Sequence, residues 1–216
     1  MDYKKVYNEN YFNGKNSFFW KLGYGNFSRF YFNNMFRNIR KYVPKNHGRT
    51  VLDVGCAYGF MLQKLPDSYK KFRIDISQHA ISVAKKRLPG ATLKICGAED
   101  QLAFQQDFFD IILLNDVLEH LKFPKIALKN IQKLLKKDGI LYITTPNLNL
   151  MRKKIYRYAD KKEHHVSLFP HLELKSTLDS LGFRIMDHWT FLNFFAYLKF
   201  ESNIGPESAF ICKKIN

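Results

Sequence analysis

The chain has 216 residues, which is enough for one sizeable hydrophobic core but hardly for two. Its 46% hydrophobic content predicts a folded protein, and its net charge of +16 favours anionic partners (phosphates, acidic lipids or nucleic acid), with a general solubility bias as the alternative. Cys56, Cys96 and Cys212 form no C-x-x-C pair, which argues against a disulfide framework or a zinc site. Because the sequence has no apolar leader and no apolar run of the roughly 20 residues that a membrane span needs, we expect a cytoplasmic protein.

Residues 1–45 differ in composition from the rest of the chain. They hold fourteen aromatic side chains, and residues 1–50 carry ten Lys or Arg against two acids. We expect a helix over about 27–42 that ends before Pro44, because the residue before a proline disfavours helical backbone. The sequence therefore predicts an aromatic-rich N-terminal cover over 1–45, followed by a main domain over 46–216.

From Thr50 onward, short apolar strands alternate with helices for about a hundred residues. Ser77 is suited to cap a helix after the second strand, and Gly139 stands where a glycine would end a helix over about 124–137. This alternation predicts a doubly wound parallel sheet. The expected strands are 50–54, 72–76, 92–96, 109–114 and 140–144.

The last part of the chain is predicted to add an antiparallel hairpin at one edge of the sheet. A helix over about 170–181 is followed by a strand at 183–191 and a final strand near 209–213. An apolar aromatic stretch at 192–200 connects these two strands. Regular structure is expected to lapse after Pro146, where residues 151–162 carry six basic residues and one acid.

The most informative motif is VLDVGCAYG, residues 51–59. A buried strand containing Asp53 leads into a turn with Gly55 and Gly59, after which we expect a helix, because such glycines allow a ligand close to the backbone at a helix N-terminus. Asp75 closes the second strand 20 residues after Gly55, where an acid would bind ribose hydroxyls. The unit predicts a nucleoside site. The alternatives are a satisfied strand-end carboxylate for Asp53 and a capping or surface role for Asp75.

Five ordered segments resemble the class I S-adenosylmethionine-dependent methyltransferases. They are VLDVGCAYG (51–59), RIDIS (73–77), GAED (97–100), FDIILLNDVLEHL (109–121) and LLKKDGILYITTPN (134–147). The turn departs from G-x-G-x-x-G because Ala57 stands where a middle glycine could, and we expect binding to survive this small side chain.

Three shorter motifs are similar to the branch that contains ubiquinone-biosynthesis O-methyltransferases and many sugar and natural-product enzymes: Leu118-Glu119-His120, Thr145-Pro146-Asn147 and His165-Val166-x-x-Phe169. The opening at 7–14 also looks like the openings of bacterial saccharide-cluster methyltransferases.

The resemblance implies a Rossmann-like α/β sheet of seven strands in the order 3-2-1-4-5-7-6, under an N-terminal helical cover. It makes 46–216 a methyltransferase domain that binds S-adenosylmethionine. It places Asp53, Gly55, Ala57 and Gly59 at the methionine and ribose end of the cofactor, and Asp75 on the ribose hydroxyls. It places Ile76, Ala98 and Glu99 around adenine and Asn115 near the methionyl group.

The expected reaction is methylation of an oxygen on a small-molecule, saccharide or lipid-linked acceptor. A phenol has a pKa near 10, so a base or a cation assists its reaction at neutral pH. His165 and His120 are the candidate bases. In the ubiquinone branch, acids and the histidine of this loop can hold a divalent metal, and Asp116, Glu119 and His120 occupy the matching places. The same tripeptide only braces the loop in many relatives, and we expect no metal site.

Two other functions compete with this interpretation. Nucleic-acid methylation is suggested by the positive charge, but the fourth strand ends in NDVL (115–118) rather than in an Asn/Asp-Pro-Pro-aromatic turn, and no Pro-Cys dipeptide offers a nucleophile. A non-catalytic, cofactor-binding partner subunit is the second. The intact glycine turn and Asp75 argue against loss of cofactor binding.

The basic residues predict an acceptor that is anionic or is presented at an anionic membrane surface. They cluster in the N-terminal cover and at 152–162, both expected near the acceptor mouth. The late aromatic residues are expected on the same side, with burial in the core or in a homodimer interface as the alternative. They are Phe191, Phe194, Phe195, Tyr197 and Phe200.

Overall fold

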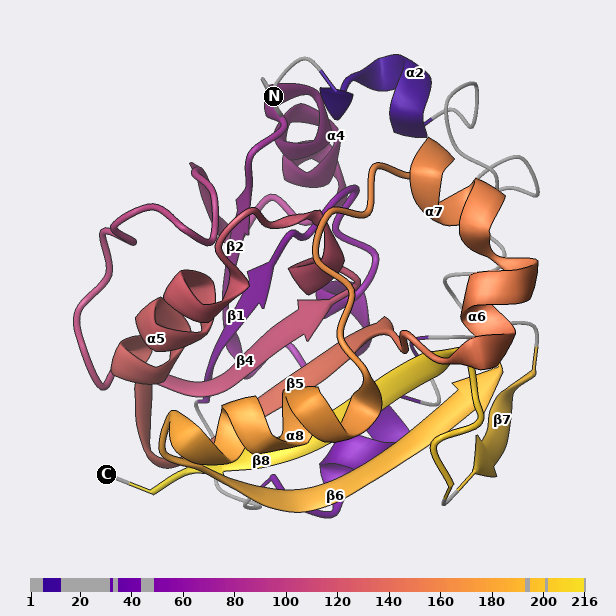
Figure 1. Cartoon of the computed structure of the whole chain (residues 1–216). Coiled ribbons are helices and arrows are strands. Elements are labelled where there is room, and N and C mark those ends of the chain that lie inside the picture. The colour runs from indigo at the N-terminus through magenta and orange to yellow at the C-terminus, as the bar shows by residue number, and fades with distance from the viewer. Residues whose placement is uncertain are drawn as a thin grey trace.

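The computed structural model describes residues 6–12, 32, 35–43, 49–192, 195–200 and 202–215, without the side chains of 195–198. Eight strands form one sheet in the order β3-β2-β1-β4-β5-β8-β6-β7 (Figure 1). The strands are β1 (Thr50–Val54), β2 (Lys70–Asp75), β3 (Thr92–Ile95), β4 (Phe109–Asn115), β5 (Leu135–Pro146), β6 (Phe183–Leu192), β7 (Phe195–Phe200) and β8 (Glu207–Lys214).

The sheet confirms the predicted α/β class and the order of the shared strands. The first five strands pair in parallel, and β8 lies antiparallel between β5 and β6. The predicted count of seven is wrong by one, because residues 195–200 are not a connecting stretch but an edge strand paired with β6. Phe and Tyr favour strands, and the edge of β6 offers unpaired backbone groups with which this segment pairs.

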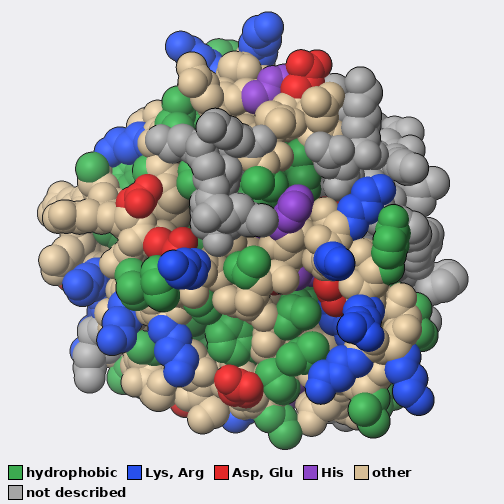
Figure 2. Space-filling model, turned by 45° about the horizontal axis from the view of Figure 1, so that its top comes forward, with side chains coloured by type: hydrophobic (Ala, Val, Ile, Leu, Met, Phe, Trp, Pro, Cys, Tyr) green, Lys and Arg blue, Asp and Glu red, His purple; other side chains and the backbone are tan. Residues whose placement is uncertain are grey.

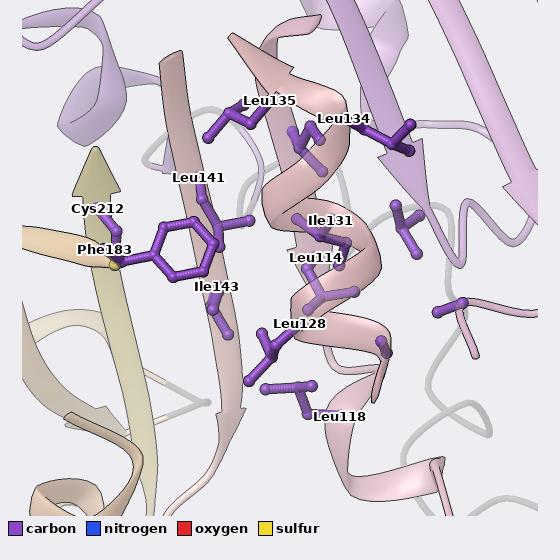
Figure 3. Packing of buried hydrophobic residues seen from close by; sticks show 14 of the residues in the cluster. Leu114, Leu118, Leu128, Ile131, Leu134, Leu135, Leu141, Ile143, Phe183 and Cys212 are labelled. Carbon is purple, nitrogen blue, oxygen red and sulfur yellow. The ribbon is translucent and has the colours of Figure 1, made fainter. Parts of the chain in front are cut away.

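Helices cover both faces of the sheet, as in a doubly wound fold. Helices α5 (Pro124–Leu134) and α8 (His171–Ser180) contribute buried residues to the cluster on one face. Figure 3 shows Leu128 and Ile131 of α5 directed at Leu114 of β4 and Leu141 of β5. On the other face, helical residues 35–40 bury Met35 and Ile39 against the sheet, and α4 (Gln78–Arg87) packs on β2 and β3.

Of two predicted helix ends, the structure confirms one and shows that the other is wrong. Ser77 caps α4, since its Oγ accepts a hydrogen bond from the backbone N–H of Ala80 at 3.1 Å. Gly139 does not end α5. The helix stops at Leu134, and residues 135–146 run on as β5. The backbone N–H groups of Asp107 and Phe108, just before β4, donate to the carbonyls of Lys133 and Leu134, so the last turn of α5 is satisfied there without a glycine cap.

Two connections also differ from expectation. The helix expected after the glycine turn is reduced to a single 3-10 turn, η2 (Leu62–Lys64), because Pro66 lacks the N–H that a continuing helix needs. The segment after β5 is more regular than expected and forms α6 (Leu150–Ile155) and α7 (Arg157–Lys162). The Asn149 side chain caps α6 by accepting from the N–H of Arg152 at 2.8 Å.

Near the N-terminus, the described residues include the short helix α2 (Glu9–Phe12) and part of the helix expected over 27–42. Most of the predicted cover lies outside the described residues. Among the residues that the structure does describe, no helix combines the length and apolar character needed to cross a bilayer.

Candidate functional site

The glycine turn after β1 is held in a shape that requires its small residues. Gly55 and Gly59 have φ of +71° and +73°, in the left-handed region that favours glycine, and Ala57 has φ of +46°. A Cβ atom on Gly55 would collide with Val117, and one on Gly59 would collide with the guanidinium of Arg73. The backbone N–H groups of Gly55 and Cys56 both donate to the carbonyl of Ile74, at 2.9 and 3.1 Å. The turn is thereby fixed against the end of β2.

Asp75, at the end of β2, links the glycine turn to the cap of α4. Its Oδ2 accepts from the N–H of Ala57 and its Oδ1 from the N–H of Ser77, both at 2.8 Å. An ionised carboxylate offers about four acceptor positions, so Asp75 retains capacity for a ligand such as a ribose diol. Burial raises the pKa of Asp75 to about 6. Hydrogen bonds from the backbone N–H groups of Ser77, Ala57 and Ile76 lower the pKa and offset part of this rise.

Asp53 carries an unsatisfied oxygen in the interior of the site. Its side chain is buried, and its Oδ2 has no hydrogen-bond partner among the described residues. Burial raises its pKa to about 7; the nearby Arg73 lowers it and Asp75 raises it. Arg73 itself is fully buried beneath the turn and donates to the carbonyl of Ala84 at 3.1 Å. A buried acceptor without a partner costs about 1–3 kcal/mol, which a ligand can relieve.

Beyond Asp75, the loop after β3 faces Ile76. A Cβ on Gly97 would lie 3.8 Å from Cδ1 of Ile76, so the two segments bound one space at the carboxyl edge of the sheet. Ala98 is buried, and its carbonyl accepts from Nδ2 of Asn130 at 3.3 Å. The Glu99 carboxylate accepts from the N–H of Phe123. The residues expected around adenine therefore lie next to Asp75.

The last expected cofactor residue, Asn115, lies at the end of β4. Its Nδ2 is 2.9 Å from Sδ of Met61, and its Oδ1 accepts from Oγ1 of Thr144 at 3.3 Å. Asn115 is thus clamped between the segment after the glycine turn and β5.

A second group of polar side chains surrounds His165. The Nδ1 atom of His165 lies 2.8 Å from Oδ1 of Asp160. Burial alone would raise the pKa of Asp160, but hydrogen bonds from His165 and Arg152 hold it below its usual value. An ionised carboxylate only accepts, so Nδ1 donates to Asp160, and in the neutral ring the lone pair is then on Nε2. His165 is therefore oriented as an acid–base group is in a His–Asp pair.

Arg152 holds this arrangement together from beneath. It is buried and donates to Asp160 through Nε and Nη2 and to Oε1 of Glu207 through Nη1, at distances of 2.5–3.2 Å. Burial would lower the pKa of Arg152, but the two carboxylates raise it. Glu207 is also buried, and burial raises its pKa to about 7. The guanidinium thus joins α6, α7 and β8 at one point.

His120, the other candidate base, lies beside His165 with ring centroids 4.9 Å apart. Burial and the nearby His165 lower its pKa to about 3, although a hydrogen bond with the backbone of His164 raises it, so the imidazole stays neutral at physiological pH. Its Nδ1 is buried without a partner among the described residues. A group with so low a pKa is a poor general base at pH 7.

The residues after β4 also define what could hold a metal ion. One ligand atom each from Glu119, His120 and His165 lie within 4.8 Å of one another. Asp116 is not part of this group, and its Oδ1 accepts from Oγ1 of Thr144 at 3.1 Å. Glu119 also braces the loop, because its carbonyl accepts from the N–H groups of Val166 and Ser167. The possible ligand set therefore replaces Asp116 with His165.

Helix α2 reaches both groups of residues. Its Tyr11 hydroxyl donates to Oε2 of Glu163 at 3.0 Å, next to the His165 segment. Phe12 lies against the ring of Tyr58, in the glycine turn, with centroids 5.0 Å apart. Just before α2, the Tyr7 ring contacts the edge of the His120 ring, at 5.4 Å. Residues 7–12 thus connect the glycine turn with the loops after β4 and β5.

Asp160, Arg152, Glu207 and Tyr11 were given no individual role from the sequence, although the cover and residues 152–162 were expected near the acceptor mouth. Asp160 lies five residues before His165, a spacing that could have suggested a His–Asp pair. The contribution of Glu207 depends on β8 lying beside β5, which no local motif reveals.

Comparison with known proteins decides the family. A family described as a methyltransferase domain matches residues 27–188 of this chain. The chain belongs to this methyltransferase family. The enzyme is thus a methyltransferase of the S-adenosylmethionine-dependent class. A protein named ubiquinone biosynthesis O-methyltransferase, from Coxiella burnetii, is 30% identical to it over 163 residues, covering 68% of this chain and 70% of the relative.

Solved structures share the fold of this methyltransferase. An S-adenosylmethionine-dependent methyltransferase from Thermotoga maritima superposes with a TM-score of 0.66 at 19% identity, over 88% of this chain and 92% of the other. A phosphoethanolamine N-methyltransferase from Haemonchus contortus, in complex with phosphomonomethylethanolamine and S-adenosylhomocysteine, superposes with a TM-score of 0.68 at 16% identity, over 85% and 53% of the two chains.

Proposed function

We propose that this methyltransferase transfers the methyl group of S-adenosylmethionine to an oxygen of a small-molecule, saccharide or lipid-linked acceptor, with His165 as the general base. The observation that carries the proposal is the His165–Asp160 pair, at 2.8 Å, beside the loops that follow β4 and β5. The name of the relative from Coxiella burnetii, an O-methyltransferase, supports oxygen as the acceptor atom.

The proposed cofactor residues are those expected from the sequence. The glycine turn, with Ala57, would face the methionine and ribose end, and the Asp75 carboxylate would accept hydrogen bonds from the ribose hydroxyls. Asp53, whose buried Oδ2 lacks a partner among the described residues, would gain one. Ile76, Ala98 and Glu99 would surround the adenine, and Asn115 the methionyl group.

The cofactor supplies an electrophilic methyl group on a sulfonium, so the protein needs only to align the acceptor and remove its proton. In the proposed step, Nε2 of His165 would take the hydroxyl proton as the acceptor oxygen bonds to the methyl carbon and the bond from that carbon to sulfur breaks, with S-adenosylhomocysteine as the leaving group. Asp160 accepts from Nδ1 throughout and stabilises the imidazolium that results. Neutral His120 lines the same space without competing for the proton.

We also propose that residues 1–45 cover this site. Tyr7, Tyr11 and Phe12 contact elements on both sides of it, which supports a cover that spans the cofactor and acceptor regions. The alternative is that these aromatic residues serve only to pack on the surface. Hydrogen exchange with and without S-adenosylhomocysteine tests this: protection of residues 6–12 should rise with ligand, and unchanged protection would contradict a cover over the cofactor.

Transfer of a radiolabelled methyl group tests the function. Wild-type protein, S-adenosylmethionine and separate pools of phenols, phosphorylated saccharides, lipid extract and transfer RNA are incubated, and label in each pool is counted. We expect label in a hydroxyl-bearing small-molecule or lipid pool, and loss of that label with His165→Ala. Label confined to RNA would support nucleic-acid methylation instead. Binding of S-adenosylhomocysteine without transfer to any pool would support a non-catalytic subunit.

A further inference from the structure

Helices α6 and α7 present an unusual outer surface. We define the α6–α7 surface as Leu150, Lys153, Lys154, Ile155, Arg157, Tyr158 and Lys161, with the adjacent Ile204. Among the described residues, the four most exposed large hydrophobic side chains all belong to it, at 77% for Leu150, 71% for Tyr158, 67% for Ile155 and 60% for Ile204. The Nδ2 atom of Asn149 donates to the carbonyl of Ile204 at 3.0 Å, which fixes Ile204 beside the start of α6. Exposed hydrophobic residues gathered in this way indicate an interaction site, whereas single ones do not.

The charge of the same surface has one sign. Lys153, Lys154, Arg157 and Lys161 are exposed, whereas Asp160, the one acid within 150–162, is buried against Arg152. In Figure 2, Lys and Arg side chains stand among hydrophobic ones on the right, the side on which α6 and α7 lie in Figure 1. The partner is therefore negatively charged and also has an apolar layer.

These two properties together select the partner. A soluble phosphorylated compound would bind the cations and leave Leu150 and Ile155 in water. A nucleic acid is bound through phosphates and through aromatic rings that stack on bases, but three of the four exposed apolar side chains here are aliphatic. Aliphatic side chains among lysines suit the interface of a bilayer, where the apolar groups enter the acyl boundary and the ammonium groups meet lipid phosphates. We propose that the α6–α7 surface docks on anionic phospholipid bilayers.

Docking at this place has a consequence for the site. The helices that form the surface also carry Arg152 and Asp160, which orient His165. A docked bilayer would therefore lie next to the base, where a lipid-linked acceptor would have to arrive. Only this consequence rests on the proposed function, because docking is measured without catalysis.

The structure supplies a matched control. Helix α5 and the residue before it also combine apolar and basic side chains, but Phe123 and Ile126 are less exposed, at 51% and 46%. Changes at Lys125 and Lys129 alter net charge as much as changes at Lys153 and Lys154.

Co-sedimentation of the full chain with vesicles tests the proposal. Wild-type protein should bind vesicles that contain phosphatidylglycerol, should not bind phosphatidylcholine alone, and should be released by salt. Near an anionic surface each basic residue strengthens binding about fivefold, so Lys153→Glu with Lys154→Glu should weaken it at least tenfold. Leu150→Ser with Ile155→Ser should weaken it to a similar degree without reducing its salt dependence. Lys125→Glu with Lys129→Glu should change it less than threefold.

Three results would overturn the proposal: no binding to either type of vesicle, undiminished binding by both α6–α7 variants, or an equal loss with the α5 control. Binding of S-adenosylhomocysteine, measured on the same proteins, should be unchanged in every variant. It thus separates a failure of docking from a failure of the proposed methyltransferase function.

Discussion

The carboxyl edge of the sheet has two parts that bury their acids in different ways. We call the glycine turn with Asp53 and Asp75 the cofactor half, and the residues around His165 the acceptor half. In the cofactor half, Asp53 keeps a carboxylate oxygen without a partner among the described residues, and Asp75 accepts hydrogen bonds from backbone N–H groups and has no cationic partner among those residues. In the acceptor half, Asp160 and Glu207 are both paired with Arg152. Unsatisfied buried acceptors suit a ligand that brings donors, whereas a satisfied network orients a side chain in advance. We therefore expect a ligand to complete the cofactor half, whereas the protein's own side chains already satisfy the acceptor half.

The largest expected effect concerns the base of the acceptor half. His165→Ala should lower the rate of methyl transfer by about 10²–10⁴-fold, the range for loss of a general acid–base group, with little change in cofactor affinity. Single-turnover transfer from labelled S-adenosylmethionine measures it. The neighbour His164→Asn is the control, since asparagine tolerates the positive φ of +60° at that position.

The same transfer assay shows whether His165 acts as a general base or as a metal ligand. We expect wild-type protein treated with a chelator to retain its rate, because His165 removes the proton itself. Loss of the rate on chelation and its return with a divalent cation would instead assign Glu119, His120 and His165 as ligands.

The second-largest expected effect is the loss of folding stability when the ion pairs of Arg152 are removed. Arg152→Met leaves the buried carboxylates of Asp160 and Glu207 without their cation, which should cost about 3–5 kcal/mol of folding free energy. Urea unfolding measures it. Lys153→Met, one residue away and exposed, should stay within about 0.5 kcal/mol of wild type. A similar loss in both variants would mean that the buried network is not what stabilises this region.

Asp53, the acid without a partner in the cofactor half, should destabilise the ligand-free protein when it is ionised, in contrast to the paired acids around Arg152. The pKa of Asp53 is raised from 3.8 to about 7, so the folded state binds its proton more tightly than the unfolded state does. Its contribution to stability is therefore present below about pH 4 and is lost as the pH rises toward 7, by at most about 4 kcal/mol.

Asp53→Asn should remove this loss and make the ligand-free protein more stable than wild type at pH 8, while weakening cofactor binding. Thermal unfolding at pH 5 and pH 8 measures the stability difference. Asp67→Asn, at a fully exposed position, is the control. If Asp53→Asn and wild type change equally with pH, Asp53 is satisfied in the ligand-free protein and the contrast between the two halves fails.

The smallest effect concerns the connection between the halves. Tyr11→Phe removes the buried hydrogen bond to Glu163 and should cost about 1.5 kcal/mol, the low end for a bond to a charged group. Hydrogen exchange should show faster exchange at residues 6–12. Tyr158→Phe, at an exposed tyrosine, should leave both stability and exchange unchanged.

Sequence predicted the shape of the glycine turn, the Ser77 cap and the strand that ends in Asp75, because the determinants of these features are local. The turn VLDVGCAYG, the Ser77 cap and the strand that ends in Asp75 are each defined within a few residues. The acceptor half was predicted only in its histidines, because Arg152, Asp160 and Glu207 meet through the placement of β8 beside β5. Phe191, expected near the acceptor mouth, is buried in the core, and the side chains of Phe194, Phe195 and Tyr197 lie outside the described residues. The exposed apolar residues are instead on α6 and α7, which sequence periodicity does not reveal in helices of six residues.

Calorimetric titration with S-adenosylhomocysteine, comparing wild type with Asp75→Ala, tests the assignment of the cofactor half most directly. Asp75 retains acceptor capacity for ribose hydroxyls, each bond to a charged group being worth about 1.5–3 kcal/mol. We predict that wild type binds and that Asp75→Ala binds at least tenfold more weakly, with Asp67→Ala unchanged. Equal affinity in wild type and Asp75→Ala, with both proteins folded, would place the cofactor elsewhere and contradict the account.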